Sequence, residues 1–278
     1  MEGDSFMKKS LISLLACLFI FPLFATGVMA AGKGQGKEVS TTVMSYNIHH
    51  AVGIDGQLSL QRIADVIRDS GAEIVGLQEV DRHYGERSDF KDQAKELAGL
   101  LGYHYAYGAN LDLEPGEGQT NNRQYGTAIV SKYPILRSEN TWLSSFGKEQ
   151  RGVLHAIINL KGIHVDVYNT HLGLDVTSRT AQAQEIIDLA SGSQGPALLM
   201  GDFNAEPESS EFRLLLDSGL FVNSFEGIDD AYTFPVINPS ATIDYILTSP
   251  NVRHANQRVI QTEASDHLPI AAEVIFKR

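Results

Sequence analysis

The chain has 278 residues, of which 43% are hydrophobic and 20% charged, and its formal net charge is −12. This composition is that of an ordinary globular protein, and the length allows one large domain or two small ones with a sizeable core. The negative charge argues against a tight, non-specific nucleic-acid binder, which is usually basic. It leaves room for a nuclease whose metal ion supplies local positive charge.

Residues 1–30 have the pattern of a secretory signal peptide: a short basic segment, an apolar run from Leu11 to Phe24, and small residues up to Ala30. We therefore expect cleavage near Ala30 and a secreted protein. A retained membrane anchor is less favoured, because the run is short and contains Pro22. A lipoprotein signal ending at Cys17 is also less favoured, because the residues that follow it are apolar rather than a polar tether.

Cys17 is the only cysteine, so once the signal is removed no disulfide and no catalytic thiol is expected. The glycine-rich residues 31–40 are predicted to form a flexible linker. Residues 41–278 show no further linker and no internal repeat, which indicates one domain.

Strands and helices alternate along this domain, as is typical of an α/β fold. Strands are predicted over 41–50, 73–80, 125–135, 153–162, 164–173, 196–204, 242–249 and 268–276, and helices over 58–71, 90–102, 178–192 and 209–219. Ser59 and Gly71 are the expected start and stop of the first helix. The polar stretch 111–124 is expected to form a long loop.

Polar side chains lie at or near the ends of several predicted strands, where α/β enzymes place their active sites. They are Asn47, Glu79, His171, Asp202, Asn204, Asp244, Asp266 and His267. Taken singly, each has an ordinary explanation as a turn cap, an exposed charge or a structural histidine. Because alternate residues of a strand share a face, Asp202 and Asn204 are expected to point into one cleft while Phe203 packs into the core.

Seven segments, in this order, resemble the endonuclease/exonuclease/phosphatase superfamily. They are MSYNI (44–48), GLQEV (76–80), YGTAIVSKYPI (125–135), YNTHL (168–172), GDFNAEP (201–207), TIDYI (242–246) and SDHLPI (265–270). The resemblance implies a four-layer α/β/β/α sandwich of two mixed sheets flanked by helices. It also implies a hydrolase of phosphate esters that uses Mg²⁺ or, alternatively, Mn²⁺. The resemblance does not decide whether the site binds one metal ion or two.

The resemblance assigns roles to individual residues. It implies a metal site formed by Asn47, Glu79 and Asp266, and a catalytic group formed by His171, Asp202, Asn204, Asp244 and His267. Within that group, Asp202 would orient and deprotonate the attacking water, and His267, oriented by Asp244, would contact the phosphate. His171 would protonate the leaving group or bind phosphate, and Arg151 and Tyr125 would bind substrate. Zinc is less favoured, because His49 and His50 would face opposite ways on a strand.

The substrate is expected to be a phosphate ester in nucleic acid, a phospholipid headgroup or a small molecule. A secreted phosphodiesterase or endonuclease is favoured. The alternatives are a phosphatase acting on inositol phosphates or similar compounds, and a sphingomyelinase-like lipid phosphodiesterase for which Trp142 and Phe146 would form a small aromatic hairpin. Trp142 is nevertheless expected to pack against the sheet. A binding protein without activity is disfavoured because no site residue is missing, and a monomer without a stable protein partner is expected.

Overall fold

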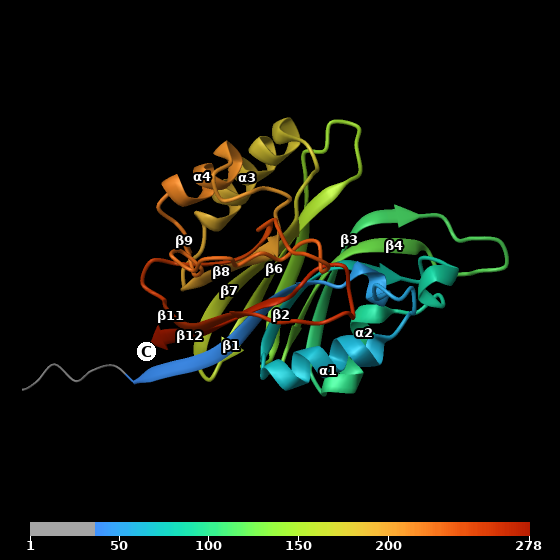
Figure 1. The fold of residues 1–278 in the computed structure, drawn as a ribbon, viewed down its shortest axis with the longest axis horizontal. Helices are drawn as coiled ribbons and strands as arrows, with labels where there is room; N and C mark the ends of the chain where they lie inside the picture. Colours follow the sequence, from blue (N-terminus) through green and yellow to red (C-terminus); the bar gives the residue numbers. More distant parts are fainter. Residues whose placement is uncertain (1–36) are drawn as a thin grey trace, which may run out of the picture. The chain divides into compact units, whose positions relative to one another are not determined.

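The computed structural model describes residues 37–278, so the signal or anchor predicted at 1–30, and most of the linker, lie outside the described residues. Two six-stranded mixed sheets pack face to face (Figure 1). The first sheet has the order β11 (Arg253–Val259), β12 (Ile270–Lys277), β1 (Glu38–Asn47), β2 (Ile74–Arg82), β4 (Arg123–Ser131), β3 (His104–Leu113). The second has the order β5 (Ile135–Leu143), β6 (Arg151–Leu160), β7 (Ile163–His171), β8 (Ala197–Asp202), β10 (Asp244–Thr248), β9 (Val222–Asn223).

Helices cover the outer face of each sheet, so the predicted four-layer α/β/β/α sandwich is confirmed (Figure 1). The first sheet carries α1 (Leu60–Ser70) and α2 (Gln93–Leu101), and the second carries α3 (Val176–Ala190) and α4 (Ser210–Asp217). Two short 3₁₀ helices, η1 (His49–Ala51) and η2 (Glu86–Ser88), complete the helical elements of the described residues.

Strand alternation distributes apolar side chains between the layers. Val43 and Ile74 belong to the core between the two sheets, whereas their neighbours Met44 and Val75 belong to the core beneath α1 and α2. Because both faces of the central strands are buried, these strands read as nearly continuous apolar runs in the sequence.

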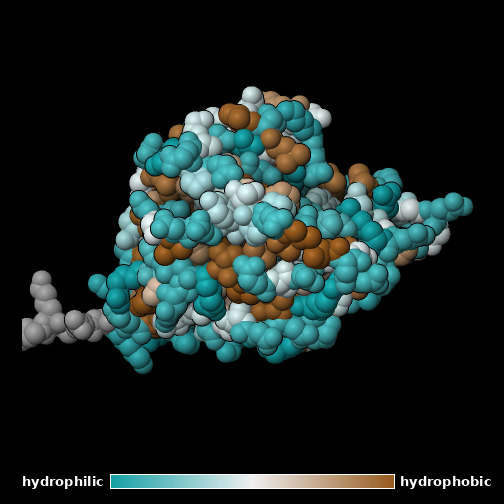
Figure 2. Space-filling model, viewed as in Figure 1, coloured by the Kyte–Doolittle hydropathy of each residue, from teal (hydrophilic) through white to brown (hydrophobic). Residues whose placement is uncertain are grey.

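The first helix begins and ends where the sequence predicts. The Ser59 hydroxyl accepts a hydrogen bond from the Arg62 amide, and Gly71 ends the helix with a φ of 71°. Figure 2 shows hydrophilic residues over most of the viewed face, with a band of apolar residues across its middle. Among the described residues, no helix is long and apolar enough to cross a membrane.

Four strands with an irregular hydrophobic pattern were not predicted from the sequence: β3, β5, β9 and β11. All four lie at sheet edges, where partly exposed side chains weaken the alternation of apolar and polar residues. Residues 111–113 belong to β3 rather than to the predicted loop, and the rest of the β3–β4 connection projects from the body (Figure 1). The first strand begins at Glu38, inside the predicted linker, because Val39 packs into the core between the sheets.

Trp142 corrects a second expectation, because its side chain does not pack against the sheet. It lies on β5 opposite Gly152 and is 62% exposed. Its indole Nε1 donates a hydrogen bond to the Ala109 carbonyl at 3.0 Å. Phe146, in the following turn, is also 62% exposed.

Candidate active site

Asn47, the last residue of β1, joins the ends of the two sheets. Its buried amide Nδ2 donates to Glu79 Oε1 at 3.0 Å and to Asp202 Oδ2 at 3.0 Å, while its Oδ1 accepts from the His49 amide at 3.1 Å. Glu79 lies in the first sheet and Asp202 in the second. The Asn47 side chain therefore fixes the distance between Glu79 and Asp202, which are 123 residues apart in the sequence.

The sequence predicted Glu79 at or near the end of its strand. In the structure Glu79 lies within β2, which continues to Arg82. The pairing of β2 with β4 shifts register between Leu77 and Val80, and Glu79 has a φ of 57°. Such a bulge redirects a side chain out of the regular alternation. Gln78 points inward and donates to Asn169 Oδ1 at 2.7 Å, and Glu79 reaches the site.

Three neighbouring strands bring the buried acids and histidines together. His171 ends β7 and lies beside Asp202 in the parallel β7–β8 pair, and Asp244 begins β10 directly opposite Asp202 in the antiparallel β8–β10 pair. His171 Nε2 is 3.5 Å from Asp202 Oδ2, and His267 Nε2 is 3.7 Å from the same oxygen. His267 Nδ1 is 2.9 Å from Asp244 Oδ2. An ionised carboxylate only accepts hydrogen bonds, so Nδ1 carries a proton and Nε2 of His267 faces Asp202.

Burial and charge separate the protonation states of these groups. Burial, followed by the nearby Asp244 carboxylate, raises the pKa of Asp202. Burial alone would lower the pKa of His267, but the charge and hydrogen bond of Asp244, with the charges of Asp202 and Asp266, together raise it. Burial, with the positive charges of Arg151 and His267, holds the pKa of His171 well below its usual range. At neutral pH His267 is therefore an imidazolium and His171 a neutral imidazole.

The segment after β8 keeps part of the expected geometry. Phe203 is fully buried, as predicted, and a Cβ at Gly201 would collide with the Thr170 carbonyl oxygen, which explains the glycine. The strand ends at Asp202, however, so strand alternation does not place Asn204. Asn204 has a φ of 49°, its amide N–H donates to Asp202 Oδ1 at 2.9 Å, and its Nδ2 donates to the Leu172 carbonyl at 3.0 Å.

Arg151 and Tyr125 border this group. Arg151 is buried, with its Nη1 3.1 Å from Glu149 Oε1. Its charge lowers the pKa of His171 and opposes the rise in the pKa of Tyr125. Burial, then the carboxylates of Glu79 and Glu149, raise the pKa of Tyr125. Arg151 thus acts electrostatically on both residues.

Asp266 is half-buried beside His267, and its Oδ1 is 3.4 Å from the Ser265 hydroxyl. That hydroxyl donates to the Asn47 carbonyl at 2.7 Å. Ser265 was not predicted as a site residue. It ties the segment that carries Asp266 and His267 to the end of β1.

Asn169 is a second residue that the sequence analysis missed. It is fully buried, its Nδ2 donates to the Leu77 and Ala128 carbonyls at 2.8 Å, and its Oδ1 accepts from Gln78. It therefore connects the second sheet to two strands of the first. The strand pattern could have indicated this position. Asn169 lies two residues after Val167 on β7 and so faces the same core between the sheets.

The donors at this site fit a divalent cation. Glu79 Oε2 takes part in no hydrogen bond among the described residues, and the buried Asp244 Oδ1 has no partner there either. Uncompensated buried carboxylate oxygens are costly, and hard cations prefer such ligands. The carboxylates of Asp202 and Asp244, which lie in one group of side chains with ligand atoms within 4.8 Å of one another, offer further oxygen ligands.

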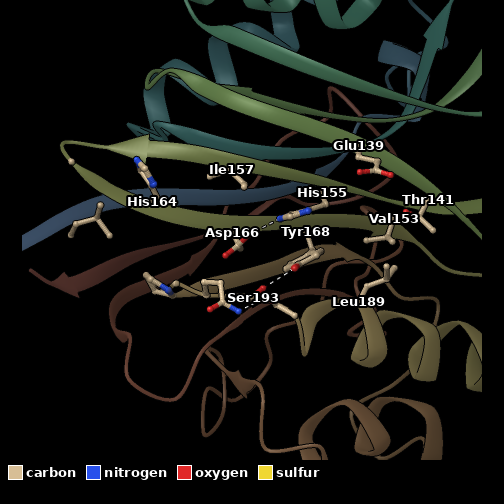
Figure 3. Close-up of a pocket in the computed structure, with 16 residues that line it drawn as sticks. Glu139, Thr141, Val153, His155, Ile157, His164, Asp166, Tyr168, Leu189 and Ser193 are labelled. Carbon is tan, nitrogen blue, oxygen red and sulfur yellow. Dashed lines mark hydrogen bonds and ion pairs between the residues drawn. The ribbon is translucent and has the colours of Figure 1, made fainter.

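A hollow of about 690 Å³ lies elsewhere, between β6, β7 and the end of α3 (Figure 3). No predicted site residue lines it. Its polar groups satisfy one another: His155 Nε2 is 2.7 Å from Asp166 Oδ1, and the Tyr168 and Ser193 hydroxyls are 2.7 Å apart. The predicted site residues lie instead at or near the strand ends described above.

Comparisons with known proteins bear on the family and the fold. A sequence profile described as the endonuclease/exonuclease/phosphatase family matches residues 44–267. The chain is 30% identical over 259 residues to the protein YbhP of Escherichia coli K12, described as uncharacterized, covering 86% of this chain and 98% of that protein.

Solved structures share the fold. An endonuclease/exonuclease/phosphatase from Beutenbergia cavernae has a TM-score of 0.73 at 24% identity, covering 85% of this chain and 71% of that one. A mannosyl-6-phosphatase from Bacteroides thetaiotaomicron has a TM-score of 0.69 at 22% identity, covering 85% of this chain and all (100%) of that one.

Proposed function

Because the chain belongs to the endonuclease/exonuclease/phosphatase family, we propose that it is a divalent-metal-dependent phosphodiesterase in which Asp202 activates the attacking water. One observation carries the proposal. Asn47 holds Glu79 and Asp202 together across the two sheets, while Asp244 presents His267 to the same Asp202 oxygen. The group thus combines a carboxylate ligand, a base and a cationic hydrogen-bond donor.

Each residue has a role that its environment favours. A cation bound by Glu79, with Asn47 and Asp266 beside it, would neutralise charge on the phosphoryl oxygens. Asp202 has a raised pKa, so it is a stronger base than an ordinary aspartate and accepts the proton of the water as its oxygen bonds to phosphorus. As the bond to the leaving oxygen breaks, the His267 imidazolium stabilises the negative charge.

The neutral state of His171 narrows its role. Transfer of a proton to the leaving group requires an imidazolium, and the pKa of His171 lies well below its usual range. We therefore assign His171 to hydrogen bonding with the phosphate rather than to proton donation. Asn204, whose amide holds the other Asp202 oxygen, positions the base.

The pairing of basic side chains favours a diester over a polyphosphate. Six basic side chains were compared, and all but one form ion pairs: Arg82–Asp92, Arg87–Asp81, Lys91–Glu96, Lys132–Glu73 and Arg151–Glu149. The exception, Arg123, donates to the Tyr84 carbonyl at 2.9 Å. Cations already paired in this way do not form the cluster that an inositol polyphosphate requires.

A phospholipid diester is the second candidate. Trp142 and Phe146 are each 62% exposed on the segment that leads to Arg151, and aromatic side chains of this kind enter a membrane interface. We further propose, from the signal-like sequence of residues 1–30, that the protein is secreted.

Hydrolysis of bis-p-nitrophenyl phosphate, plasmid DNA, sphingomyelin and p-nitrophenyl phosphate, with Mg²⁺ or Mn²⁺ and then with EDTA, tests the proposal. We expect cleavage of a diester that stops with EDTA. Activity confined to the monoester would overturn the diester assignment, and full activity in EDTA would overturn the role of the metal.

Substitutions test the residues. Asp202→Asn and His267→Ala should each lower kcat by about 10²- to 10⁴-fold, the usual contribution of a proton-transfer group. Glu79→Ala should raise the metal concentration needed for half-maximal activity. Asp65→Asn, which changes an exposed acid on α1, is the control, and circular dichroism verifies folding. A fully active His267→Ala protein would contradict the site assignment.

A further inference from the structure

The turn that follows β1 differs from its prediction. The sequence predicted a strand through His50, with His49 and His50 facing opposite ways. The strand ends at Asn47 instead, and η1 follows with positive φ angles at His49 (44°), His50 (42°) and Ala51 (63°). Three successive left-handed residues without glycine are costly. They bring both imidazole rings together, with centroids 4.4 Å apart.

The bulge at Glu79 points to the same place. One nitrogen from each histidine and one carboxylate oxygen of Glu79 all lie within 4.8 Å of one another. Asn47 occupies Oε1 of Glu79, which leaves Oε2 for a ligand. Two segments with unfavourable backbone angles thus converge on one cluster of metal-binding atoms, a pattern typical of functional sites.

The hydrogen bonds leave nitrogen lone pairs available. His49 Nδ1 is 3.1 Å from the Val52 carbonyl, which can only accept, so Nδ1 carries the proton and Nε2 keeps its lone pair. Such a carbonyl partner is the usual way of orienting a metal-binding histidine. His50 Nδ1 is buried without a hydrogen-bond partner among the described residues.

Metal binding requires a neutral imidazole, so a positive charge nearby would matter. Arg87 lies on η2, which packs against η1. Arg87 does not repel a cation strongly from this place, because Asp81 pairs with its guanidinium through two hydrogen bonds of 2.7 and 2.8 Å.

We propose that His49, His50 and Glu79 bind a transition-metal ion such as Zn²⁺ through two nitrogens and one oxygen. Imidazole selects Zn²⁺ and its neighbours over Mg²⁺, which prefers oxygen ligands. Neighbouring ligands of one zinc ion lie about 3.3 Å apart at bond lengths of about 2.0 Å, so modest side-chain rotations close the site. The inference rests on the proposed function in that Glu79 serves as a metal ligand in both.

The test measures metal binding by the EDTA-stripped full chain without substrate. We expect about one equivalent of Zn²⁺ per chain in competition with a chromophoric chelator, and an affinity at least about 100-fold higher than that for Mg²⁺. Co²⁺ should give the intense visible absorption of a site with few ligands. Equal affinity for Zn²⁺ and Mg²⁺, or a Co²⁺ spectrum like that of the hydrated ion, would overturn the proposal.

Variants locate the ion. His49→Asn and His50→Asn should each weaken Zn²⁺ binding by at least about tenfold. Asparagine tolerates left-handed angles, so the turn is preserved. His104→Asn, at an exposed histidine on β3, should bind as the unmodified chain does. Unchanged Zn²⁺ binding by both turn variants would refute the site. If neither variant folds, the Co²⁺ spectrum of the unmodified chain decides.

The outcomes separate this inference from the proposed function. Diester hydrolysis with Mg²⁺ in a chain that binds Zn²⁺ no more tightly than Mg²⁺ would overturn the inference alone. Tight Zn²⁺ binding that depends on His49 and His50, in a chain without phosphoesterase activity under any metal, would support the inference and overturn the proposed function.

Discussion

The neighbours of Asp202 orient its carboxylate through hydrogen bonds and also raise its pKa. The Asn47 side chain and the Asn204 amide donate to its two oxygens, while burial and the Asp244 carboxylate oppose its charge. The hydrogen bonds fix the direction of the carboxylate, and the unfavourable environment makes it basic. This combination suits a group that must accept a proton near neutral pH.

The raised pKa of Asp202 predicts how activity depends on pH. Asp202 must be ionised to accept the proton of water, and its pKa is raised to about 7. At saturating metal, kcat/KM should therefore fall about tenfold for each pH unit below this pKa. A bound cation lowers the pKa, so about 7 is the upper limit of the midpoint. A pH–rate profile measures it, and a midpoint above this limit, or a rate that rises as the pH falls, would contradict the role of Asp202.

Single residues also show how far the sequence could lead. The positions of Asp202 and His171 near strand ends were predictable, because each follows an apolar run that reads as a buried strand. The convergence of His49 and His50 was not predictable. It depends on a left-handed turn formed without glycine, and no residue type in the sequence indicates such a turn.

Among the elements, β2 and β7 show how the inter-sheet contact supports the site. Gly76 on β2 faces Asn169 on β7, and a Cβ at Gly76 would lie 2.7 Å from Asn169 Oδ1. The same Oδ1 accepts from Gln78, the residue before Glu79. The close approach of the two sheets therefore sets the position of the bulge that carries Glu79.

A glycine substitution tests this contact. Gly76→Ala should lower the free energy of unfolding by about 1–3 kcal/mol, because the methyl group displaces a fully hydrogen-bonded buried amide. Gly99→Ala on α2 is the matched control: nothing lies within 4 Å of its Cβ, and alanine should stabilise the helix by up to about 1 kcal/mol. Urea denaturation measures both, and equal stability of the two variants would refute the packing argument.

At the scale of the whole molecule, the net charge of −12 affects the encounter with substrate. A polyanion such as DNA is repelled at long range, whereas a small diester with one negative charge is repelled far less. The local cation at the site acts only at short distance.

Salt dependence tests this effect. Raising NaCl from about 10 to 150 mM at fixed metal should increase kcat/KM for double-stranded DNA several-fold, because the Debye length shortens from about 30 to 8 Å. The value for bis-p-nitrophenyl phosphate should change less than about twofold. A steep decrease with salt for DNA would indicate binding through positive contacts and contradict the prediction.

The sequence by itself determined the alternation of strands and helices in one domain, and the resemblance of seven segments implied the four-layer fold and the family. Strands buried on both faces read as apolar runs, and helices with clear caps have recognisable ends, so both can be identified from the sequence. The edge strands β3, β5 and β11 have a weaker hydrophobic pattern, because many of their side chains are partly or fully exposed and packing constrains them less.

Only the tertiary structure decided how the site is assembled. The Asn47 bridge, the bulge at Glu79, the Asn169 contact between the sheets and the pairing of His49 with His50 all depend on segments that are distant in sequence or on backbone angles that no side chain requires. The two sheets must pack before their strand ends meet, and that packing turns separate polar residues into one group with separated pKa values.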